Sequence, residues 1–187
     1  LHATLEHAAE TCRDEVFQEK KLKLEFELSA EHSVVLGDGA RLRQVFWNLI
    51  KNAVKFTPDG GTIRLRSRDA ECDEVAIEVS DTGIGIEPDM LPHIFSAFEQ
   101  GGAHITKRFG GLGLGLAICR ALVEMHGGHI SAHSEGRGRG ARFVVRLPLR
   151  LGSGLKEPRP MEGASGKQAS TGAGGRRILL VEDHEHT

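Results

Sequence analysis

The sequence predicts a domain of the α/β class, because two hydrophobic periods take turns along its first 148 residues. Helical segments repeat apolar residues at i, i+3, i+4 and i+7, whereas strand segments alternate apolar and polar residues. The composition changes at residue 149, where this patterning stops. We therefore expect one folded domain followed by sequence of a different character.

Composition narrows the function classes before any motif is considered. The 187 residues carry a formal net charge of −2, so no strongly basic face indicates nucleic acid. No apolar run reaches membrane-spanning length and no signal peptide opens the chain, which favours a cytoplasmic domain without direct membrane contact, even if its parent is membrane-anchored. The three cysteines and ten histidines show no metal-ligand or disulfide spacing. The first residue is not Met, which suggests an excised fragment.

The N-terminal elements are predicted from periodicity. Residues 1–19 are expected to form a helix, with Leu5 and Cys12 on its apolar face. Lys21–Leu28 alternates apolar and charged residues, which is typical of a half-buried strand. Val34–Leu36 is expected to be a short strand.

The most informative helix spans Gly37 to Pro58. Asp38 is the expected N-cap, and Thr57 followed by proline supplies a stop signal. Seven apolar residues at helical spacing form the face that we expect to be buried: Leu42, Val45, Phe46, Leu49, Ile50, Ala53 and Val54.

Two asparagines on this helix point to a function. Asparagine is a poor helix former, because its amide competes for nearby backbone groups. Asn48 and Asn52 are four residues apart and share a face, with Lys55 on the same edge. This edge flanks the apolar stripe, so we expect its side chains to be half-buried. A helix that merely tolerates two amides is the plain alternative.

Two alternating segments, Thr62–Arg68 and Glu74–Ser80, are predicted to pair as antiparallel strands. The second runs directly into the motif Asp81–Ile86, which reads Asp-Thr-Gly-Ile-Gly-Ile. A carboxylate at a strand end can accept a hydrogen bond from a flat ligand such as adenine, and glycines let the backbone come close. The alternative is a plain strand-to-helix turn.

The segment after this motif combines a predicted helix with a predicted loop. Pro88 is expected to start a helix that contains Ile94, Phe95 and Phe98. Glu99–Gly110 then shows no periodicity over twelve residues. A loop of this length inside a compact domain is usually functional or mobile.

A second glycine run, Gly111–Leu116, opens a helix that is predicted to reach about His126. The free N–H groups and partial positive charge of a helix N-terminus suit phosphate, whereas glycines chosen for packing are the alternative. The helix is apolar nearly all round apart from Arg120 and Glu124, so we expect it to be central. Two further alternating segments are predicted to be strands: His129–Ser134 and Ala141–Leu147.

Residues 1–148 resemble the catalytic and ATP-binding domain of sensor histidine kinases, in the GHKL ATPase and kinase superfamily. Four motifs in family order carry this resemblance: the N box Asn48–Phe56, the first glycine box Asp81–Ile86, the F box Ile94–Gln100 and the second glycine box Gly111–Ile118. The chain departs from the family at Ala97, where proline is frequent, and at Leu112, where threonine is frequent. Neither departure removes a charged or chelating group.

The resemblance implies a Bergerat-type two-layer α/β sandwich, in which a mixed, mostly antiparallel sheet packs on helices. It also implies ATP and Mg²⁺ as cofactors, with Asn52 as the metal ligand and Asn48 beside the nucleotide. Lys55 is expected to reach phosphate, Phe56 to line the adenine side and Asp81 to accept the adenine amine. The resemblance places residues 99–110 in a mobile lid and implies further nucleotide contacts from Gly83, Gly85, Ile86, Lys107, Arg108, Gly111, Leu112, Gly113, Leu114, Gly115 and Leu116.

One position of the N box bears on the reaction. ATP-hydrolysing relatives, such as gyrase-type and mismatch-repair proteins, carry a glutamate four residues before the Mg²⁺ asparagine as general base for water. This chain has Asn48 there, and an amide cannot take a proton at neutral pH. The resemblance therefore implies Mg²⁺-assisted transfer of the γ-phosphoryl group to a protein histidine rather than efficient hydrolysis.

The resemblance also implies a domain that supplies the histidine. We expect a dimerisation and phosphoacceptor domain before Leu1, with residues 1–19 as the connecting helix and 20–148 as the ATP-binding domain. Acting alone, the chain is expected to bind ATP without phosphorylating itself.

The C-terminal sequence suggests a second partner. Residues 149–175 are rich in Gly, Ser, Pro and Ala and are predicted to be a flexible linker. Residues 176–187 resemble the start of a response-regulator receiver domain, with Glu182 and Asp183 matching its acidic pair. A charged, disordered tail is the alternative. The expected partners are therefore the chain's own histidine domain and a receiver domain or response regulator.

Two other functions would use the same ATP site. One is a serine kinase of the anti-sigma type, and the other is a non-catalytic module that senses nucleotide. Residues 1–19 and the receiver-like tail argue against the first. Intact Asn52 and Asp81 argue against the second, although they indicate binding rather than turnover.

Overall fold

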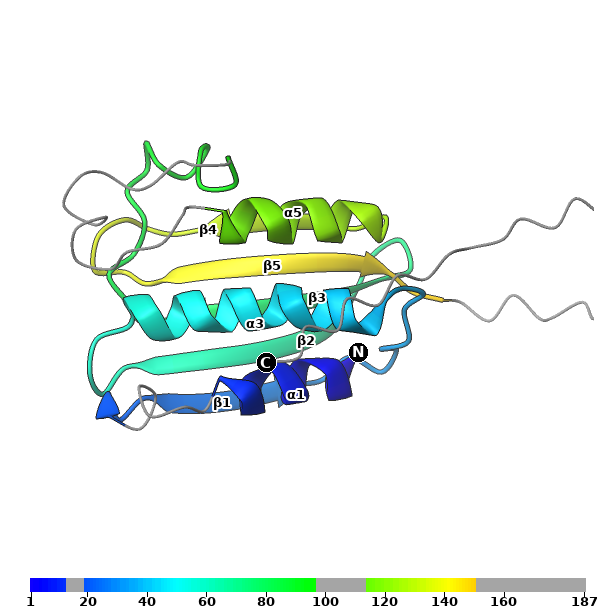
Figure 1. Ribbon diagram of the computed structural model, residues 1–187, viewed down its shortest axis with the longest axis horizontal. Helices are drawn as coiled ribbons and strands as arrows, with labels where there is room; N and C mark the ends of the chain where they lie inside the picture. The colour runs from blue at the N-terminus through cyan, green and yellow to red at the C-terminus, as the bar shows by residue number, and fades with distance from the viewer. Residues whose placement is uncertain (13–18, 97–113, 151–187) are drawn as a thin grey trace, which may run out of the picture. The chain divides into compact units, whose positions relative to one another are not determined.

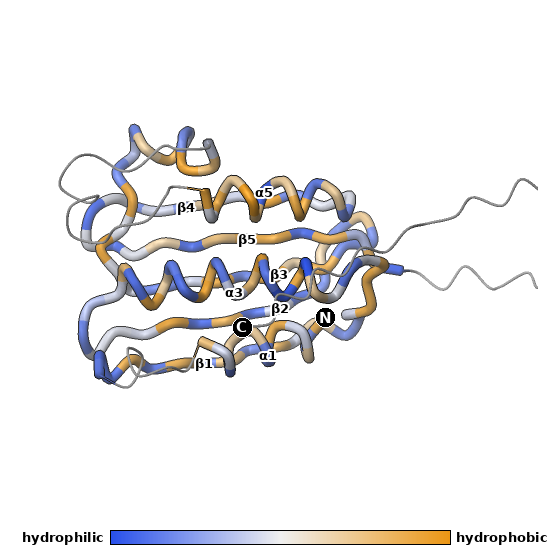
Figure 2. Tube along the Cα trace, in the orientation of Figure 1, coloured by the Kyte–Doolittle hydropathy of each residue, from blue (hydrophilic) through white to orange (hydrophobic). Residues whose placement is uncertain are grey.

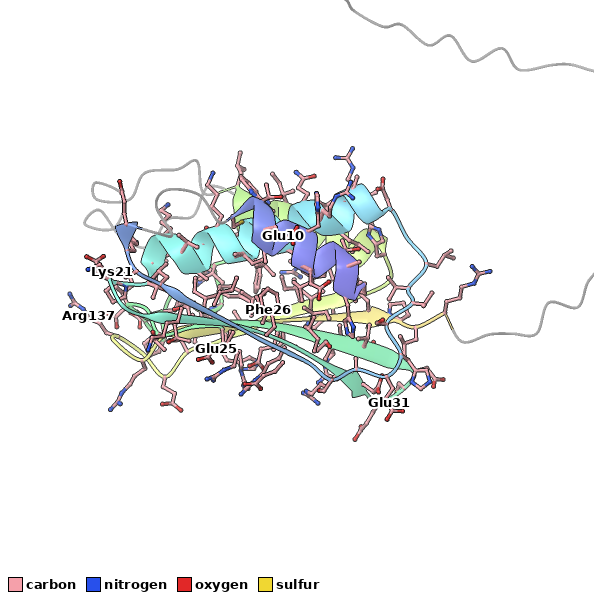
Figure 3. All side chains as sticks on the ribbon, turned by 90° about the horizontal axis from the view of Figure 1, so that it is seen from below. Glu10, Lys21, Glu25, Phe26, Glu31 and Arg137 are labelled. Carbon is pink, nitrogen blue, oxygen red and sulfur yellow. The ribbon has the colours of Figure 1, made fainter. Side chains whose placement is uncertain are left out.

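The computed structural model describes residues 1–12, 19–96 and 114–150. In this part of the chain, helices lie on one face of a five-stranded sheet (Figure 1, Figure 3). The elements in chain order are α1 (His2–Thr11), β1 (Lys23–Leu28), α3 (Gly39–Phe56), β2 (Thr62–Ala70), β3 (Glu74–Asp81), α5 (Gly115–Met125), β4 (His129–His133) and β5 (Ala141–Pro148).

The sheet is mixed and mostly antiparallel, as predicted. Its strand order is β1-β2-β3-β5-β4. Only β1 and β2 run parallel among the paired strands, because α3 lies between them in the chain and carries it back to the starting end. Strand β3 lies in the middle, paired with β2 on one side and β5 on the other. The last residue of β3, Asp81, therefore lies between two neighbouring strands.

The core lies between the helices and the inner face of the sheet. All seven apolar residues predicted for α3 are buried, and Phe46, Leu49 and Ile50 have no exposed surface. Figure 2 shows hydrophobic and hydrophilic residues alternating along α3 from turn to turn, as expected for a helix with one buried face. Helix α1 contributes Leu5 and its neighbours to the same core.

The outer face of the sheet carries ion pairs instead of a second layer. Arg64 bonds to Glu25 across β1 and β2, with 2.7 Å between Arg64 Nη2 and a carboxylate oxygen. Arg66 reaches Glu27 at 2.6 Å and, more distantly, Glu78 of β3. Exposed pairs of this kind add little stability each, so this face is best understood as solvated. The fold is thus the predicted two-layer sandwich.

Two predicted elements are wrong. Residues 88–96 form successive turns rather than a helix, because the amides of Met90, His93 and Ser96 each bond to the carbonyl three residues earlier. Val34–Leu36 is not a strand, since only Val35 forms a single bridge, to Leu149. Short apolar runs do not distinguish a helix or a strand from a turn.

The two outer helices differ from the expectation in extent and in burial. Helix α1 ends at Thr11, and the remainder of the predicted helix falls mainly in residues 13–18, outside the described residues. Helix α5 is not buried all round: Ile118 and Met125 are exposed, at 39% and 80%. Its apolar composition therefore overstated how central it is. The predicted lid and C-terminal tail also lie outside the described residues.

Candidate nucleotide-binding site

The ends of three secondary-structure elements lie close together at one end of the sheet. Figure 1 shows the last turn of α3, the end of β3 and the first turn of α5 on the same side of the domain. These are the places to which the N box and the two glycine boxes map. The motifs are therefore brought together by the fold, although they are separated along the chain.

The asparagine edge of α3 is half-buried, as predicted. Asn48 and Asn52 are both of intermediate exposure, and they flank the buried stripe. The thiol of Cys119 on α5 donates to the Val45 carbonyl of α3 at 3.7 Å and lies beside the Asn48 amide, and burial raises the pKa of this thiol to about 12. This contact could not be predicted from the sequence, because the two residues lie on different helices. It places Asn48 at the junction of α3 and α5.

Lys55 and Phe56 are the last two residues of α3. Lys55 Nζ lies 4.9 Å from the centre of the Phe56 ring, within range of a cation–π interaction. Burial, followed by repulsion from Lys51, lowers the pKa of Lys55 from its ordinary value. Both Lys55 and Phe56 are half-buried, so neither is an ordinary surface residue.

Asp81 is held in a fixed orientation at the end of β3. Its Oδ1 accepts the N–H of Gly83 at 2.8 Å and the N–H of Ala141 at 3.3 Å. Burial raises the pKa of Asp81, while these two backbone hydrogen bonds oppose the increase. Within the described residues, no hydrogen bond engages Oδ2. One oxygen thus holds the side chain, and the second can accept from a ligand.

The glycines after Asp81 are needed by the protein itself. A Cβ on Gly83 would lie 2.5 Å from the carbonyl oxygen of Phe56, so only glycine fits there. The next amide, that of Ile84, donates to the same oxygen at 3.1 Å. Gly85 has a φ of +74° and packs against the backbone of Gly136. The first glycine box therefore locks α3 to the β4–β5 turn, and its glycines alone do not establish a ligand.

The β4–β5 turn supports this motif through a residue that sequence reasoning missed. Ser134 Oγ accepts the N–H of Ile86 at 2.9 Å and donates to the carbonyl of Gly140 at 2.7 Å. The Gly140 amide in turn donates to the carbonyl of Gly83. The sequence shows a serine at the end of a predicted strand, and this pattern does not distinguish a residue that supports the glycine box from one in an ordinary turn.

The second glycine box is described only from Leu114 onward. Leu114 is the N-cap of α5, and its side chain forms no capping hydrogen bond with the first amides of the helix. A Cβ on Gly115 would meet no atom within 4 Å. Leu116 is half-buried against the core. The other predicted contacts lie outside the described residues: Lys107, Arg108, Gly111, Leu112 and Gly113.

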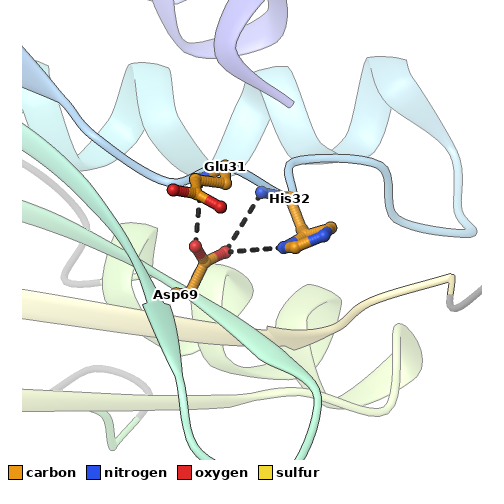
Figure 4. Close-up of side chains that lie close together, drawn as sticks. All are labelled: Glu31, His32 and Asp69. Atoms are coloured by element: carbon orange, nitrogen blue, oxygen red, sulfur yellow. Dashed lines mark hydrogen bonds and ion pairs between the residues drawn. The ribbon is translucent and has the colours of Figure 1, made fainter.

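A cluster of metal-capable side chains lies elsewhere, near the start of the β2–β3 turn (Figure 4). Asp69 accepts the N–H groups of Glu31 and His32 at 3.0 and 3.1 Å, and His32 Nδ1 lies 3.6 Å from the same carboxylate. All three residues are exposed. The carboxylate therefore anchors a loop to β2, and this explains the cluster without a metal ion.

A family model now decides the relationship of this chain to known proteins. The model for histidine kinase-, DNA gyrase B- and HSP90-like ATPases matches residues 37–151, which is more than half of the chain. The chain belongs to this ATPase family. All the described site residues of the family motifs fall within the matched range.

Sensor histidine kinases are among the similar members of the ATPase family. The circadian input-output histidine kinase CikA of Synechococcus elongatus is 43% identical over 142 residues, which cover 76% of this chain and 19% of CikA. The sensor histidine kinase RcsC of Escherichia coli is 46% identical over 132 residues, covering 71% of this chain and 14% of RcsC. The chain thus spans a fifth or less of the length of these relatives.

Solved structures confirm the fold. Full-length ShkA in complex with AMPPNP has a TM-score of 0.67 at 34% identity, covering 79% of this chain and 29% of ShkA. The catalytic domain of the histidine kinase ThkA has a TM-score of 0.65 at 30% identity, covering 79% of this chain and 91% of that domain. The resemblance predicted from the motifs is confirmed for family and fold. None of the described helices has the length and apolarity needed to cross a membrane.

Proposed function

We propose that this chain is the ATP-binding catalytic domain of a two-component sensor histidine kinase. In this proposal it transfers the γ-phosphoryl group of ATP to a histidine on a separate helical domain. The observation that carries the proposal is Asp81, a partly buried carboxylate with one oxygen fixed by two backbone amides and the other unengaged by the described residues. Such a group is suited to recognise an exocyclic amine rather than to serve the fold.

The residues around Asp81 fit the remaining parts of the nucleotide. Phe56, whose carbonyl accepts the N–H of Ile84 in the glycine turn, offers an aromatic ring, and Lys55 offers a cation for phosphate. The uncapped first turn of α5 offers backbone amides to an anion. Lys107 and Arg108 remain predicted phosphate contacts, and unchanged affinity in Arg108→Ala would contradict the second of these roles.

The donor chemistry of the α3 edge fits Mg²⁺. Asn52 is half-buried and carries an amide oxygen, a hard ligand of the kind that Mg²⁺ accepts beside phosphate oxygens and water. When bound, the metal would neutralise charge on the transferring phosphoryl group. Asn48 takes the sequence position of the general base in ATP-hydrolysing relatives, yet its amide cannot accept a proton and lies beside the Cys119 thiol. This arrangement favours transfer to a protein side chain over hydrolysis.

Two partners follow from the proposed reaction. One is the domain that carries the phosphoacceptor histidine, and the other is a response regulator or receiver domain that takes the phosphoryl group onward. The histidine kinase ThkA has been solved in complex with the response regulator TrrA, and that structure covers 79% of this chain with a TM-score of 0.63 at 30% identity. No observation favours the serine-kinase or sensing alternatives.

The binding half of the proposal is tested by titrating the 187-residue chain with ADP and AMPPNP, with and without Mg²⁺. Asp81→Asn is expected to weaken binding of both nucleotides by about tenfold or more, because a charged acceptor becomes an amide. Asn52→Ala is expected to remove the Mg²⁺ dependence while leaving weaker, metal-independent binding.

Asp73→Asn is the matched control, since this exposed aspartate lies in the turn before β3, at the strand's opposite end. It should bind nucleotide like the unaltered chain. Equal affinity in Asp81→Asn and the unaltered protein would overturn the assignment of the adenine acceptor.

A further inference from the structure

The C-terminal end of α3 shows where its last carbonyl groups find partners. A helix leaves its final four carbonyls without partners inside the helix. The Ala53 oxygen accepts both the N–H and the hydroxyl of Thr57, at 3.0 and 2.6 Å. The Phe56 oxygen accepts the N–H of Ile84 from the glycine turn. Two of the four carbonyls, those of Val54 and Lys55, therefore need donors from elsewhere.

A single side chain supplies these donors. Lys20 Nζ lies 2.8 Å from the Val54 oxygen, 3.1 Å from the Lys55 oxygen and 3.0 Å from the Thr57 oxygen. An ammonium group has three N–H donors and no acceptor, so the three carbonyls match its full capacity. Its positive charge also lies at the negative end of the helix dipole. The match is complete in number and in charge.

The backbone around Lys20 holds this side chain in place. The Lys20 carbonyl accepts the N–H of Gly60 at 2.8 Å, and the Lys23 amide donates to the carbonyl of Gly61. Lys21 has a φ of +51°, which turns the chain sharply between these two contacts. The segment before β1 is therefore tied to the loop after α3 by main chain as well as by the Lys20 ammonium.

The last turn of α3, which Lys20 holds, carries Phe56, the residue proposed to line the adenine side of the site. Lys20 holds the carbonyls on both sides of Phe56, whereas the Phe56 carbonyl itself receives the glycine turn that follows Asp81. Displacing this carbonyl would move both the Phe56 ring and the Ile84 amide. Two consecutive sets of hydrogen bonds therefore connect Lys20 to the site. The first joins Lys20 to the last turn of α3, and the second joins the Phe56 carbonyl to the Ile84 amide.

We infer that Lys20 is a positioning residue for the nucleotide site: it fixes the last turn of α3 and, through the Phe56 carbonyl, the orientation of the Asp81 turn. The expected effect of Lys20 on nucleotide affinity rests on the proposed function. The expected effect of Lys20 on the Asp81 turn rests on the hydrogen bonds alone and can be measured without nucleotide.

The test compares Lys20→Met with the unaltered 187-residue chain. Methionine keeps the length of the side chain and removes all three donors. We expect hydrogen exchange of the Ile84 amide to accelerate by about tenfold, while amides in the middle of β3 keep their protection. At a temperature where both proteins are folded, Mg²⁺-ADP affinity should fall by about tenfold. Lys23→Met, an exposed lysine on β1, is the matched control and should change neither quantity.

Lys20→Arg separates positioning from plain stabilisation and serves if Lys20→Met does not fold. A planar guanidinium keeps the charge but cannot point donors at three carbonyls around one atom, so affinity should lie between those of the other two proteins. If Lys20→Met or Lys20→Arg lowers the unfolding temperature yet leaves Ile84 exchange and ADP affinity unchanged, the positioning role is wrong. Absence of nucleotide binding by the unaltered chain would count against the proposed function, whereas unchanged Ile84 exchange would count against Lys20 alone.

Discussion

The two oxygens of Asp81 have different surroundings, and this difference is the most informative single-residue feature of the site. Oδ1 is engaged by the amides of Gly83 and Ala141, which come from different parts of the chain. The position of Asp81 after a strand could be predicted from its sequence neighbours. Its contact with Ala141 could not, because that residue follows it by sixty positions.

Burial of Asp81 leads to a prediction on stability. Its pKa is raised above the ordinary value of 3.8, so the ionised form is less favourable in the folded protein than in the unfolded chain. Stability from this group is therefore lost as the pH rises from about 3.8 through the raised pKa. Asp81→Asn, which still offers an oxygen to both amides, should have a free energy of unfolding at pH 7 equal to or above that of the unaltered chain.

Urea denaturation at several pH values measures this effect. The advantage of Asp81→Asn should shrink as the pH falls through the window, because the aspartic acid becomes neutral there. Asp73→Asn, at an exposed position in the turn before β3, is the control for the chemical change from carboxylate to amide. A marked loss of stability in Asp81→Asn at pH 7 would mean that the carboxylate is needed by the fold, contrary to a role in binding.

Helix α3 and the 88–96 segment show what can be predicted for an element. Asp38 accepts the N–H groups of Ala40 and Arg41, and the helix ends before Thr57, so local capping signals placed both ends of α3 correctly. The 88–96 segment had proline and apolar residues but no comparable run of helical period. Its partly buried Ile94 and Phe95 pack against the core from turns instead.

The glycines of the two motifs give a prediction about turns and helix starts. Gly83→Ala places a methyl group 2.5 Å from the Phe56 carbonyl and should cost about 1–3 kcal/mol of unfolding free energy. Gly115→Ala adds a methyl into open space at a helical position and should be neutral or stabilise by up to about 1 kcal/mol. Thermal or urea denaturation of both variants measures the contrast. If Gly83→Ala lost no more stability than Gly115→Ala and neither lost any, the turn would tolerate a side chain at Gly83.

At the scale of the molecule, the class of fold could be predicted, but the strand order required the structure. Periodicity identified β1, β2, β3, β4 and β5 one by one. The pairing of β2 with β3 follows from their adjacency in the chain and was predicted. The other neighbour of β3 is β5, whose Ala141 follows Asp81 by sixty positions, and nothing local specifies that pairing. The roles of Lys20 and Ser134 could not be predicted for the same reason, because the partners that define these roles lie 34 and 48 residues away in the sequence.

The proposed division of labour between domains gives a prediction for the whole chain. Incubated with labelled ATP and Mg²⁺, the 187-residue chain should bind nucleotide without acquiring acid-labile phosphate. Among the described histidines, His126 is held by the carbonyl of Leu122 and the amide of Asp38, which leaves it unsuited to accept a phosphoryl group. Adding the helical histidine domain of a related sensor kinase should produce acid-labile labelling that Asn52→Ala abolishes. Self-labelling of the chain alone would contradict this division.

The pairing of β3 with β5 also determines when the site can exist during protein synthesis. A ribosome releases α3, β2 and β3 well before it makes β5, and until then the amide of Ala141 cannot reach Asp81. The carboxylate and the glycine turn therefore acquire their final geometry only after the last strand has emerged and docked. A nascent chain arrested before residue 141 would carry every N-box residue and still lack the Ala141 amide that holds Asp81, so we expect the proposed nucleotide site to form only after β5 has docked.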